Sequence, residues 1–212
     1  MVKETRMLQS FNSITLYDNI DLVIQQDNEE KAIIEAGENL QPFITTELKD
    51  NTLTIRNNSA CDWLRSANEK ITITLFVKDI DNISYYGAGN ISSLNQLQVD
   101  DLSIDSWTGA GDIVLNINAQ SVRATIHGEN ADIILKGRAA TGTAYCTSRG
   151  TIDLRELEVK HLTITQRSVR DAFVNVTESI EAIIMYKGNV YFRGNPSRKE
   201  VTTTNEGRLL PL

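Results

Sequence analysis

A glycine or serine returns at nearly constant spacing through the second half of this chain. The intervals are 22, 19, 20, 20 and 20 residues, and the six positions are Gly87, Gly109, Gly128, Ser148, Ser168 and Gly188. The first two copies share the phrase Gly-Ala-Gly-Asn/Asp-Ile, and later copies diverge from it. A fixed period of about 20 residues is typical of a solenoid, in which each repeat stacks on the last. We therefore predict about six stacked coils.

Short runs of alternating apolar and polar residues flank each turn, for example 122–127 before the turn at Gly128 and 133–135 after it. This alternation, rich in β-branched residues, indicates half-buried strands. Because whole units of constant length recur, parallel stacked coils fit better than an array of hairpins. Two inward-facing columns are predicted. The first contains Ile91, Ile113, Ile133, Ile152, Phe173 and Val190, and the second contains Leu115, Leu135, Leu154 and Phe192.

The chain is predicted to form a single domain over 1–212, with solenoid repeats at 80–194. Before them, the strand pattern continues at 8–79 without the 20-residue period, and it includes a short hairpin turn at 49–51. A solenoid end exposes edge strands, so this region is expected to be a capping β-sheet with antiparallel pairs. Only 59–69 suggests a helical turn. The tail 195–212 is expected to fold back over the last coil.

Composition excludes several classes of protein. The 21 Lys and Arg residues are outnumbered by 28 Asp and Glu residues, and no basic stripe suggests a nucleic-acid partner. No apolar run is long enough for a transmembrane helix. The first residues lack the apolar segment of a signal peptide, which fits either a cytoplasmic protein or an exported one whose leader is not part of this chain. Cys61 and Cys146 lack metal-site spacing, and whether they are linked stays open.

Several stretches resemble one bacterial family. They are 38–48 followed by 50–55, the opening Phe11-x-x-Ile14 with 20–26, and the Gly-Ala-Gly-Asn/Asp-Ile units. Over about residues 8–195 the chain resembles the auto-transporter adhesin head GIN domain family. The resemblance implies a right-handed, parallel β-helix-like domain of the Gram-negative cell envelope, in the periplasm or at the cell surface and often lipid-anchored. It implies no catalytic residues.

Acidic and amide residues recur beside the turns, at Asn90, Asp112, Asp132, Asp171 and Asn189. Hard cations prefer such oxygen ligands, but the nonapeptide of calcium-binding β-rolls is absent, and Asx residues at turns commonly hydrogen-bond locally. We therefore predict neither a metal nor a cofactor.

Carboxylates on neighbouring coils could cleave a polysaccharide. The candidates are Asp101, Asp105, Asp112, Asp132 and Asp153. Any two acids in one column of a solenoid lie close together, so their spacing is not selective. His127 and His161 lie near no serine-nucleophile motif and are interpreted as surface residues.

Aromatic, hydroxyl and basic residues precede the turns in two columns. One column reads Tyr85, Trp107, Ile126, Cys146, Gln166 and Tyr186, and the other reads Tyr86, Thr108, His127, Thr147, Arg167 and Lys187. Strand alternation turns the two columns to opposite sides, so one is an outward strip suited to glycan or protein contact. The candidate ligand-binding residues are Tyr85, Tyr86, Trp107, His127, Arg167, Tyr186 and Lys187.

The predicted function is a non-enzymatic adhesin or recognition module of the cell envelope. Two alternatives stay open. One is a pectinase- or lyase-like β-helix enzyme, and the other is a structural module that self-associates as a homo-oligomer.

Overall fold

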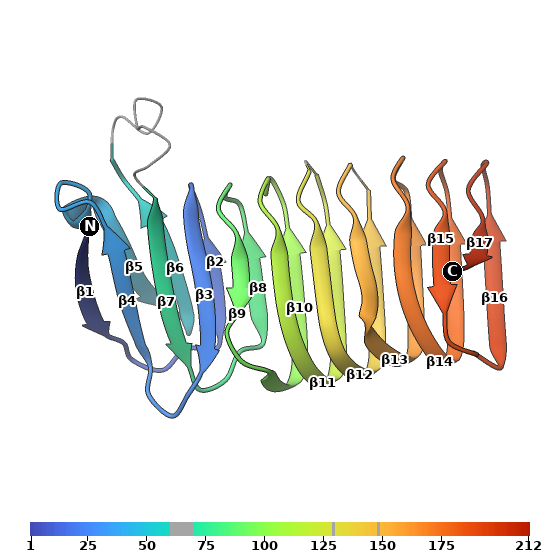
Figure 1. Ribbon diagram of the computed structural model, residues 1–212, viewed down its shortest axis with the longest axis horizontal. Helices are drawn as coiled ribbons and strands as arrows, with labels where there is room; N and C mark the ends of the chain where they lie inside the picture. Colours follow the sequence, from blue (N-terminus) through green and yellow to red (C-terminus); the bar gives the residue numbers. More distant parts are fainter. Residues whose placement is uncertain (60–69, 129, 148) are drawn as a thin grey trace.

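The computed structural model describes residues 1–59, 70–128, 130–147 and 149–212. Within these residues the only helical element is one 3-10 turn, η1 (Gln41–Phe43), and the rest of the regular structure is strand. Figure 1 shows the strands side by side along one long axis, with the two chain termini towards opposite ends. The predicted all-β solenoid of about six coils is confirmed. Cys61 and nearly all of the predicted helical turn at 59–69 fall outside the described residues.

Each coil contributes to two parallel sheets that enclose the core. We call face A the strand segments that follow each glycine- or serine-containing turn, and face B the strand segments that precede it. The long strands bend and contribute to both faces, and their register reproduces the 20-residue period, as in Ile113 paired with Ile133 and Ile126 with Cys146. The strands of this region are β8 (Asn82–Tyr85), β9 (Ile91–Ser93), β10 (Leu97–Ser106), β11 (Ile113–Ile126), β12 (Ile133–Cys146), β13 (Ile152–Gln166), β14 (Ala172–Ile184) and β15 (Val190–Arg193).

Parallel stacking extends into the residues before position 80. On face B, β2 (Ser13–Leu16) lies between β6 (Thr52–Asn57) and β8 and is parallel to both. On face A, β3 (Ile20–Gln26) lies in the same way between β7 (Ile71–Val77) and β9. The segment 13–26 is therefore a coil placed between two coils that come later in the sequence. This crossover brings Tyr17 beside the repeat region.

Antiparallel strands close the N-terminal end, as predicted. On face A, β4 (Lys31–Ala36) pairs with β7, and β1 (Val2–Met7) pairs with β4. On face B, β5 (Ile44–Lys49) forms a hairpin with β6. The hairpin turn has Asp50 and Asn51 at φ of 49° and 60°, the left-handed conformation that short polar residues tolerate.

The C-terminal tail differs from the expectation. Instead of folding back over the last coil, it adds one more parallel layer, in which β16 (Arg198–Thr203) pairs with β14 and β17 (Leu209–Pro211) pairs with β15. The inward positions of this layer are partly polar, since Lys199 aligns with Ile180 and Thr203 with Ile184.

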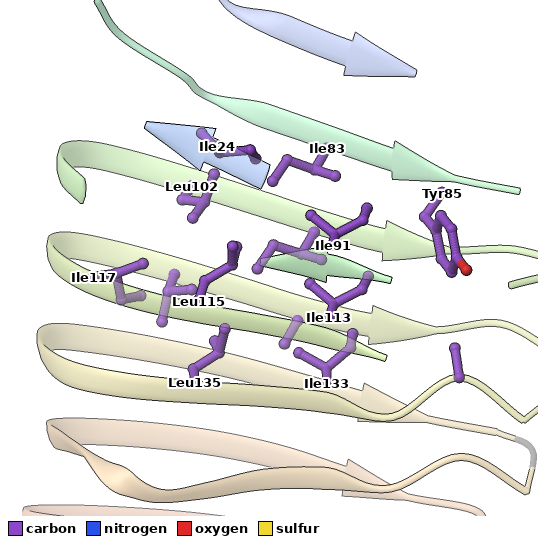
Figure 2. Close-up of a cluster of buried hydrophobic side chains, with 14 of the residues drawn as sticks. Ile24, Ile83, Tyr85, Ile91, Leu102, Ile113, Leu115, Ile117, Ile133 and Leu135 are labelled. Atoms are coloured by element: carbon purple, nitrogen blue, oxygen red, sulfur yellow. The ribbon is translucent and has the colours of Figure 1, made fainter. Parts of the chain in front are cut away.

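Aliphatic columns fill the space between the faces (Figure 2). The first predicted column is confirmed at Ile91, Ile113, Ile133, Ile152 and Val190, all fully buried. Burying each isoleucine contributes roughly 1.5–3 kcal/mol. Phe173 was assigned wrongly to this column. Ala172 pairs with Val190 inside, whereas Phe173 pairs with Asp153 on the outer surface, because successive strand residues point to opposite sides.

Close backbone approach explains the glycines of the turns. A Cβ on Gly89 would overlap the carbonyl oxygen of Ile20, and one on Gly111 would overlap the carbonyl oxygen of Gly89. Among the residues that the structure describes, the glycines with positive φ are Gly137 and Gly194, and both lie outside these turns. Gly89 and Gly111 therefore mark where successive coils touch, which only a residue without a side chain permits.

Candidate functional site: an aromatic ladder

A ladder of stacked side chains runs along the edge of face B, next to the turns. The Arg56 guanidinium lies 3.6 Å from the ring centroid of Tyr17. Tyr17 stacks on Tyr86 at 4.8 Å between centroids, Tyr86 on Trp107 at 6.3 Å, and Trp107 on His127 at 3.7 Å. The ring planes deviate from parallel by 11°, 5° and 7°. We call these five residues the aromatic ladder.

Strand register explains why these residues meet. Trp107 N–H donates to the Tyr85 carbonyl and His127 N–H to the Ser106 carbonyl, so Trp107 aligns with Tyr86 and His127. The predicted column placed Trp107 beside Tyr85 and is wrong by one residue. Counting from the turn glycine misaligns the coils because turn length varies. Five positions separate Tyr86 from Ile91, but six separate Trp107 from Ile113.

Tyr85 was predicted to bind a ligand, and this prediction is wrong. The residue lies in the core and cannot contact a ligand. Its side chain is fully buried in the column that continues through Ser106 and Ile126. Its hydroxyl donates to the Gly89 carbonyl and accepts a hydrogen bond from Gly111 N–H at 3.0 Å. Burial raises the pKa of Tyr85 to about 12, although the Gly111 N–H opposes this rise. Tyr85 therefore ties two successive turns together.

Of the remaining predicted residues, one lies in the same outward column as the ladder and two lie in a turn. Arg167 occupies the same outward column, two coils beyond His127, with Thr147 between them. Tyr186 and Lys187 lie beyond Met185, the residue aligned with this column, and belong to the next turn. Lys187 is 4.0 Å from Glu206, and Tyr186 is exposed.

Two ladder members, Tyr17 and Arg56, were missed by sequence reasoning. Both precede the repeats, and neither shows the 20-residue period. Ile14 and Leu16 alternate as in a strand and Tyr17 follows directly, but nothing in the sequence indicated that β2 would lie against β8.

Polar groups of His127, Asp105 and Tyr86 belong to the ladder or contact it. Asp105 Oδ1 lies 3.1 Å from His127 Nε2, which fixes the orientation of the imidazole. Burial raises the pKa of Tyr86, and the neighbouring Tyr17 and Asp105 raise it further, so its hydroxyl stays protonated at neutral pH. Trp107 is 43% exposed. Because the rings stack on one another, their faces are largely covered and their edges remain for a partner.

The Asx residues beside the turns form a separate, structural ladder. Asp112 N–H donates to Asn90 Oδ1 at 3.0 Å, Thr151 N–H to Asp132 Oδ1 at 2.7 Å, and Asn189 N–H to Asp171 Oδ1 at 2.7 Å. These side chains therefore bind backbone groups of the next coil, the alternative use weighed against calcium ligation. No group of three or more His, Cys, Asp or Glu in the described residues could hold a metal ion.

Two of the five candidate catalytic carboxylates are paired with arginines. Asp153 is bound by Arg155 and Asp132 by Arg170. Burial alone would raise the pKa of Asp153, but the hydrogen bonds and charge of Arg155 outweigh burial and lower it. A lowered pKa keeps this carboxyl ionised and unsuited to act as the general acid of glycoside cleavage.

His161 has partners that the sequence did not suggest. Its Nδ1 lies 2.9 Å from Ser179 Oγ, and its Nε2 lies 3.4 Å from Glu178 Oε2. The imidazole and the carboxylate are each 52% exposed, so solvent screens their interaction. The imidazole of His161 thus lies between a hydroxyl and a carboxylate, on an exposed surface. Elsewhere, no helix of the described residues is long and apolar enough to cross a bilayer.

Comparison with known proteins places these features in a family. Residues 10–196 match the family model described as "Putative auto-transporter adhesin, head GIN domain". A search of curated proteins finds no match.

Solved structures share the fold over nearly the whole chain. A putative adhesin of Bacteroides fragilis is 22% identical with a TM-score of 0.91, covering 100% of this chain and 96% of its own. A putative adhesin of Parabacteroides distasonis is 20% identical with a TM-score of 0.77, at the same coverage of both chains. A protein of the same species, named as a putative lipid binding protein, is 16% identical with a TM-score of 0.69, covering 98% of this chain and 96% of its own.

Proposed function

Since the chain belongs to the auto-transporter adhesin head GIN domain family, we propose that it is a non-enzymatic recognition domain of the cell envelope that binds a surface partner through its aromatic ladder. The observation that carries this proposal is the continuous row of Tyr17, Tyr86, Trp107 and His127 on the outside of the solenoid. Extracytoplasmic placement, at the surface or in the periplasm, follows from the adhesin family and is part of the proposal.

The ladder supports recognition because its geometry is set before a partner arrives. Tyr17, Tyr86 and Trp107 each lie between two neighbours in the row, and Arg56 and Asp105 contact its two ends. A rigid surface loses little side-chain entropy on binding, and Tyr and Trp are enriched where proteins meet partners. A partner would meet the ring edges, with their C–H groups, tyrosine hydroxyls and indole N–H. Such edges suit hydrogen bonds to a protein backbone or to glycan hydroxyls more than flat stacking of a sugar.

The enzyme alternative has weaker support. A polysaccharide-cleaving site needs one carboxyl that can hold a proton, whereas Arg155 lowers the pKa of the Asp153 carboxyl.

Charged residues at inward positions of both end layers weigh against end-to-end self-association. At the N-terminal end, Glu4 aligns with Ile34, and Arg6 bonds Glu4 and the Ile44 carbonyl. Lys199 occupies the corresponding position at the other end. Inward charges of this kind discourage strand-to-strand association.

The test is binding of the purified domain to an array of glycans and an array of cell-surface proteins, in parallel with Trp107→Ala and Tyr186→Ala. Trp107 and Tyr186 are 43% and 40% exposed, so Tyr186→Ala removes an equally exposed aromatic residue outside the ladder. We expect at least one partner that Trp107→Ala binds at least tenfold more weakly and Tyr186→Ala binds normally. Equal loss in both variants, or no effect of either, would contradict the proposal.

A further inference from the structure

The turns of the last coils expose larger side chains than the turns of the first coils. The early turns contain 87–89 and 109–111, each with the sequence Gly-Ala-Gly, whereas the later turns follow Cys146, Gln166, Ile184 and Thr203. Figure 1 shows the turns side by side along one edge of the solenoid. We call the exposed basic and apolar side chains of the later turns the basic edge. They are Arg149, Arg167, Val169, Arg170, Met185, Tyr186, Lys187 and Arg208.

Backbone hydrogen bonds hold these turns one against the next. Arg167 N–H donates to the last carbonyl of β12 at 2.7 Å. Gly188 N–H donates to the Ser168 carbonyl and Gly207 N–H to the Tyr186 carbonyl, each at 2.9 Å. Neighbouring strands in a sheet lie about 4.8 Å apart, so the exposed side chains of adjacent turns form one continuous surface.

The charge of this surface is opposite to that of the whole chain, which is −7. Its turns contain the basic residues Arg149, Arg167, Arg170, Lys187 and Arg208 and the acidic residues Asp171 and Glu206. In the part of the chain that the structure describes, Arg149, Arg167 and Arg208 form no ion pair. Arg170 is paired with Asp132, and Lys187 lies 4.0 Å from Glu206. The unpaired guanidinium groups complement an anionic partner.

Three apolar side chains are exposed among these cations. Val169 is 52% exposed, Tyr186 40% and Met185 38%. Val169 directly precedes Arg170 in the chain, and Met185 aligns with Arg167 of the preceding coil. Apolar side chains gathered on an exposed surface are typical of an interaction site. The surface therefore offers cations and apolar groups to the same partner.

We propose that the basic edge docks on the surface of a lipid bilayer that contains anionic lipids. Each Lys or Arg close to such a surface strengthens binding about fivefold. Apolar side chains and tyrosine enter the interface at the level of the headgroups, between the phosphates that the cations contact. Because the chain as a whole is acidic, an anionic bilayer attracts this edge and repels the remainder, which orients the solenoid with its late turns on the membrane.

The inference goes beyond the proposed function, because it uses residues outside the aromatic ladder. It also gives a role to Arg167, Tyr186 and Lys187, which were predicted to bind a ligand but do not stack in the ladder.

The experiment is co-sedimentation of the full chain with vesicles of pure phosphatidylcholine and with vesicles that also contain about 30 mol% phosphatidylglycerol. One double variant, Arg167→Gln with Lys187→Gln, removes two cations of the basic edge. A second, Arg123→Gln with Arg138→Gln, removes the same charge from exposed positions within β11 and β12 and is the matched control.

A pair of valine variants tests the apolar contribution. Val169→Ser changes the basic edge, and Val201→Ser changes a valine of β16 that is similarly exposed, at 47%. All four side-chain sets are exposed, so the variants should unfold at nearly the temperature of the wild type, which separates lost binding from a lost fold.

We expect the wild type to bind the anionic vesicles and not the neutral ones, and to be released by about 0.5 M salt. Arg167→Gln with Lys187→Gln should lower the partition coefficient about 25-fold, and the control double variant less than about threefold. Val169→Ser should lower it about threefold or more, whereas Val201→Ser should bind normally.

Three results would overturn the proposal: no binding to anionic vesicles, equal losses in the two double variants, or no effect of Val169→Ser. A surface suited to an acidic protein or a nucleic acid would give the first of these results. The ladder has a separate readout, because Trp107→Ala should bind the vesicles normally while it loses its partner on the arrays.

Discussion

The imidazole of His127 lies flat against the indole of Trp107, with ring centroids 3.7 Å apart and planes 7° from parallel. The two residues are 20 positions apart in the sequence and one coil apart in the structure. Parallel stacking at this register turns a sequence period into a physical contact, and the same holds for Tyr86 and Trp107. The same ladder therefore has consequences for stability as well as for recognition.

Trp107→Ala should destabilise the domain. The substitution removes two stacked contacts, with Tyr86 and with His127, and aromatic pairs contribute about 0.5–1.5 kcal/mol each. We expect a loss of about 1–3 kcal/mol in the free energy of unfolding, measured by urea denaturation. Tyr186→Ala, outside the ladder, should change it by less than about 0.5 kcal/mol. Equal stability of the two variants would mean that the stacking contributes nothing.

Tyr85→Phe should destabilise the fold although the two side chains have nearly the same shape. It leaves the Gly89 carbonyl and the Gly111 N–H without their buried partner, at a cost of about 1–3 kcal/mol for each unpaired group. Urea denaturation at neutral pH measures the loss. A change below about 0.5 kcal/mol would show that both backbone groups find other partners.

Alkaline pH should weaken the wild type through the same residue. In the folded protein the pKa of Tyr85 is about 12, above its ordinary value of 10.0, so the unfolded chain loses this proton first. The stabilisation is complete below about pH 10 and is lost as pH rises towards 12, by about 2–3 kcal/mol. Tyr85→Phe should show a flatter pH dependence over this interval. An identical slope in both proteins would contradict the assignment.

Gly89→Ala should destabilise the fold much more than Gly128→Ala. The new methyl group would overlap the Ile20 carbonyl in the first case, whereas at Gly128 the nearest atom is the Trp107 carbonyl oxygen at 3.0 Å. Overlap with backbone requires the coils to separate, at a cost of about 1–3 kcal/mol or more. Thermal unfolding followed by circular dichroism compares the two. A larger effect at Gly128 would be contrary to this account of the repeated glycines.

Lys199→Ile should make the C-terminal end of the solenoid associate. The substitution removes an inward charge that lies 5.3 Å from the Phe192 ring centroid and leaves an apolar edge layer. Sedimentation velocity should show dimers or larger species that depend on protein concentration. Lys187→Ile, in an exposed turn, is the control. Unchanged sedimentation of Lys199→Ile would indicate that the end is protected by another feature.

The sequence was sufficient to predict the architecture because a solenoid repeats its strands, turns and inward columns at a constant interval. Ile113, Ile133 and Ile152 could be aligned from spacing alone. Spacing failed where turn length changed, which displaced Trp107 by one residue. Hydrophobicity alone failed at Phe173, where a small inward alanine is followed by an outward aromatic residue.

The candidate site was only partly predictable. Tyr86, Trp107 and His127 belong to repeats and were identified as candidates. Tyr17 and Arg56 reach the ladder through the coil at 13–26 and its neighbour β6, a placement set by long-range strand pairing rather than by local pattern. The burial of Tyr85 depends on which of two adjacent aromatic residues points inward, and the strand register decides this.

The most direct test of the ladder as a recognition surface is the indole N–H resonance of Trp107 during titration with a partner identified on the arrays. The chain has two tryptophans, so Trp107→Phe assigns the signal. We predict that the Trp107 signal shifts and saturates together with binding. An indole signal that stays in place while the partner saturates the protein would contradict the proposal that the ladder is the binding surface.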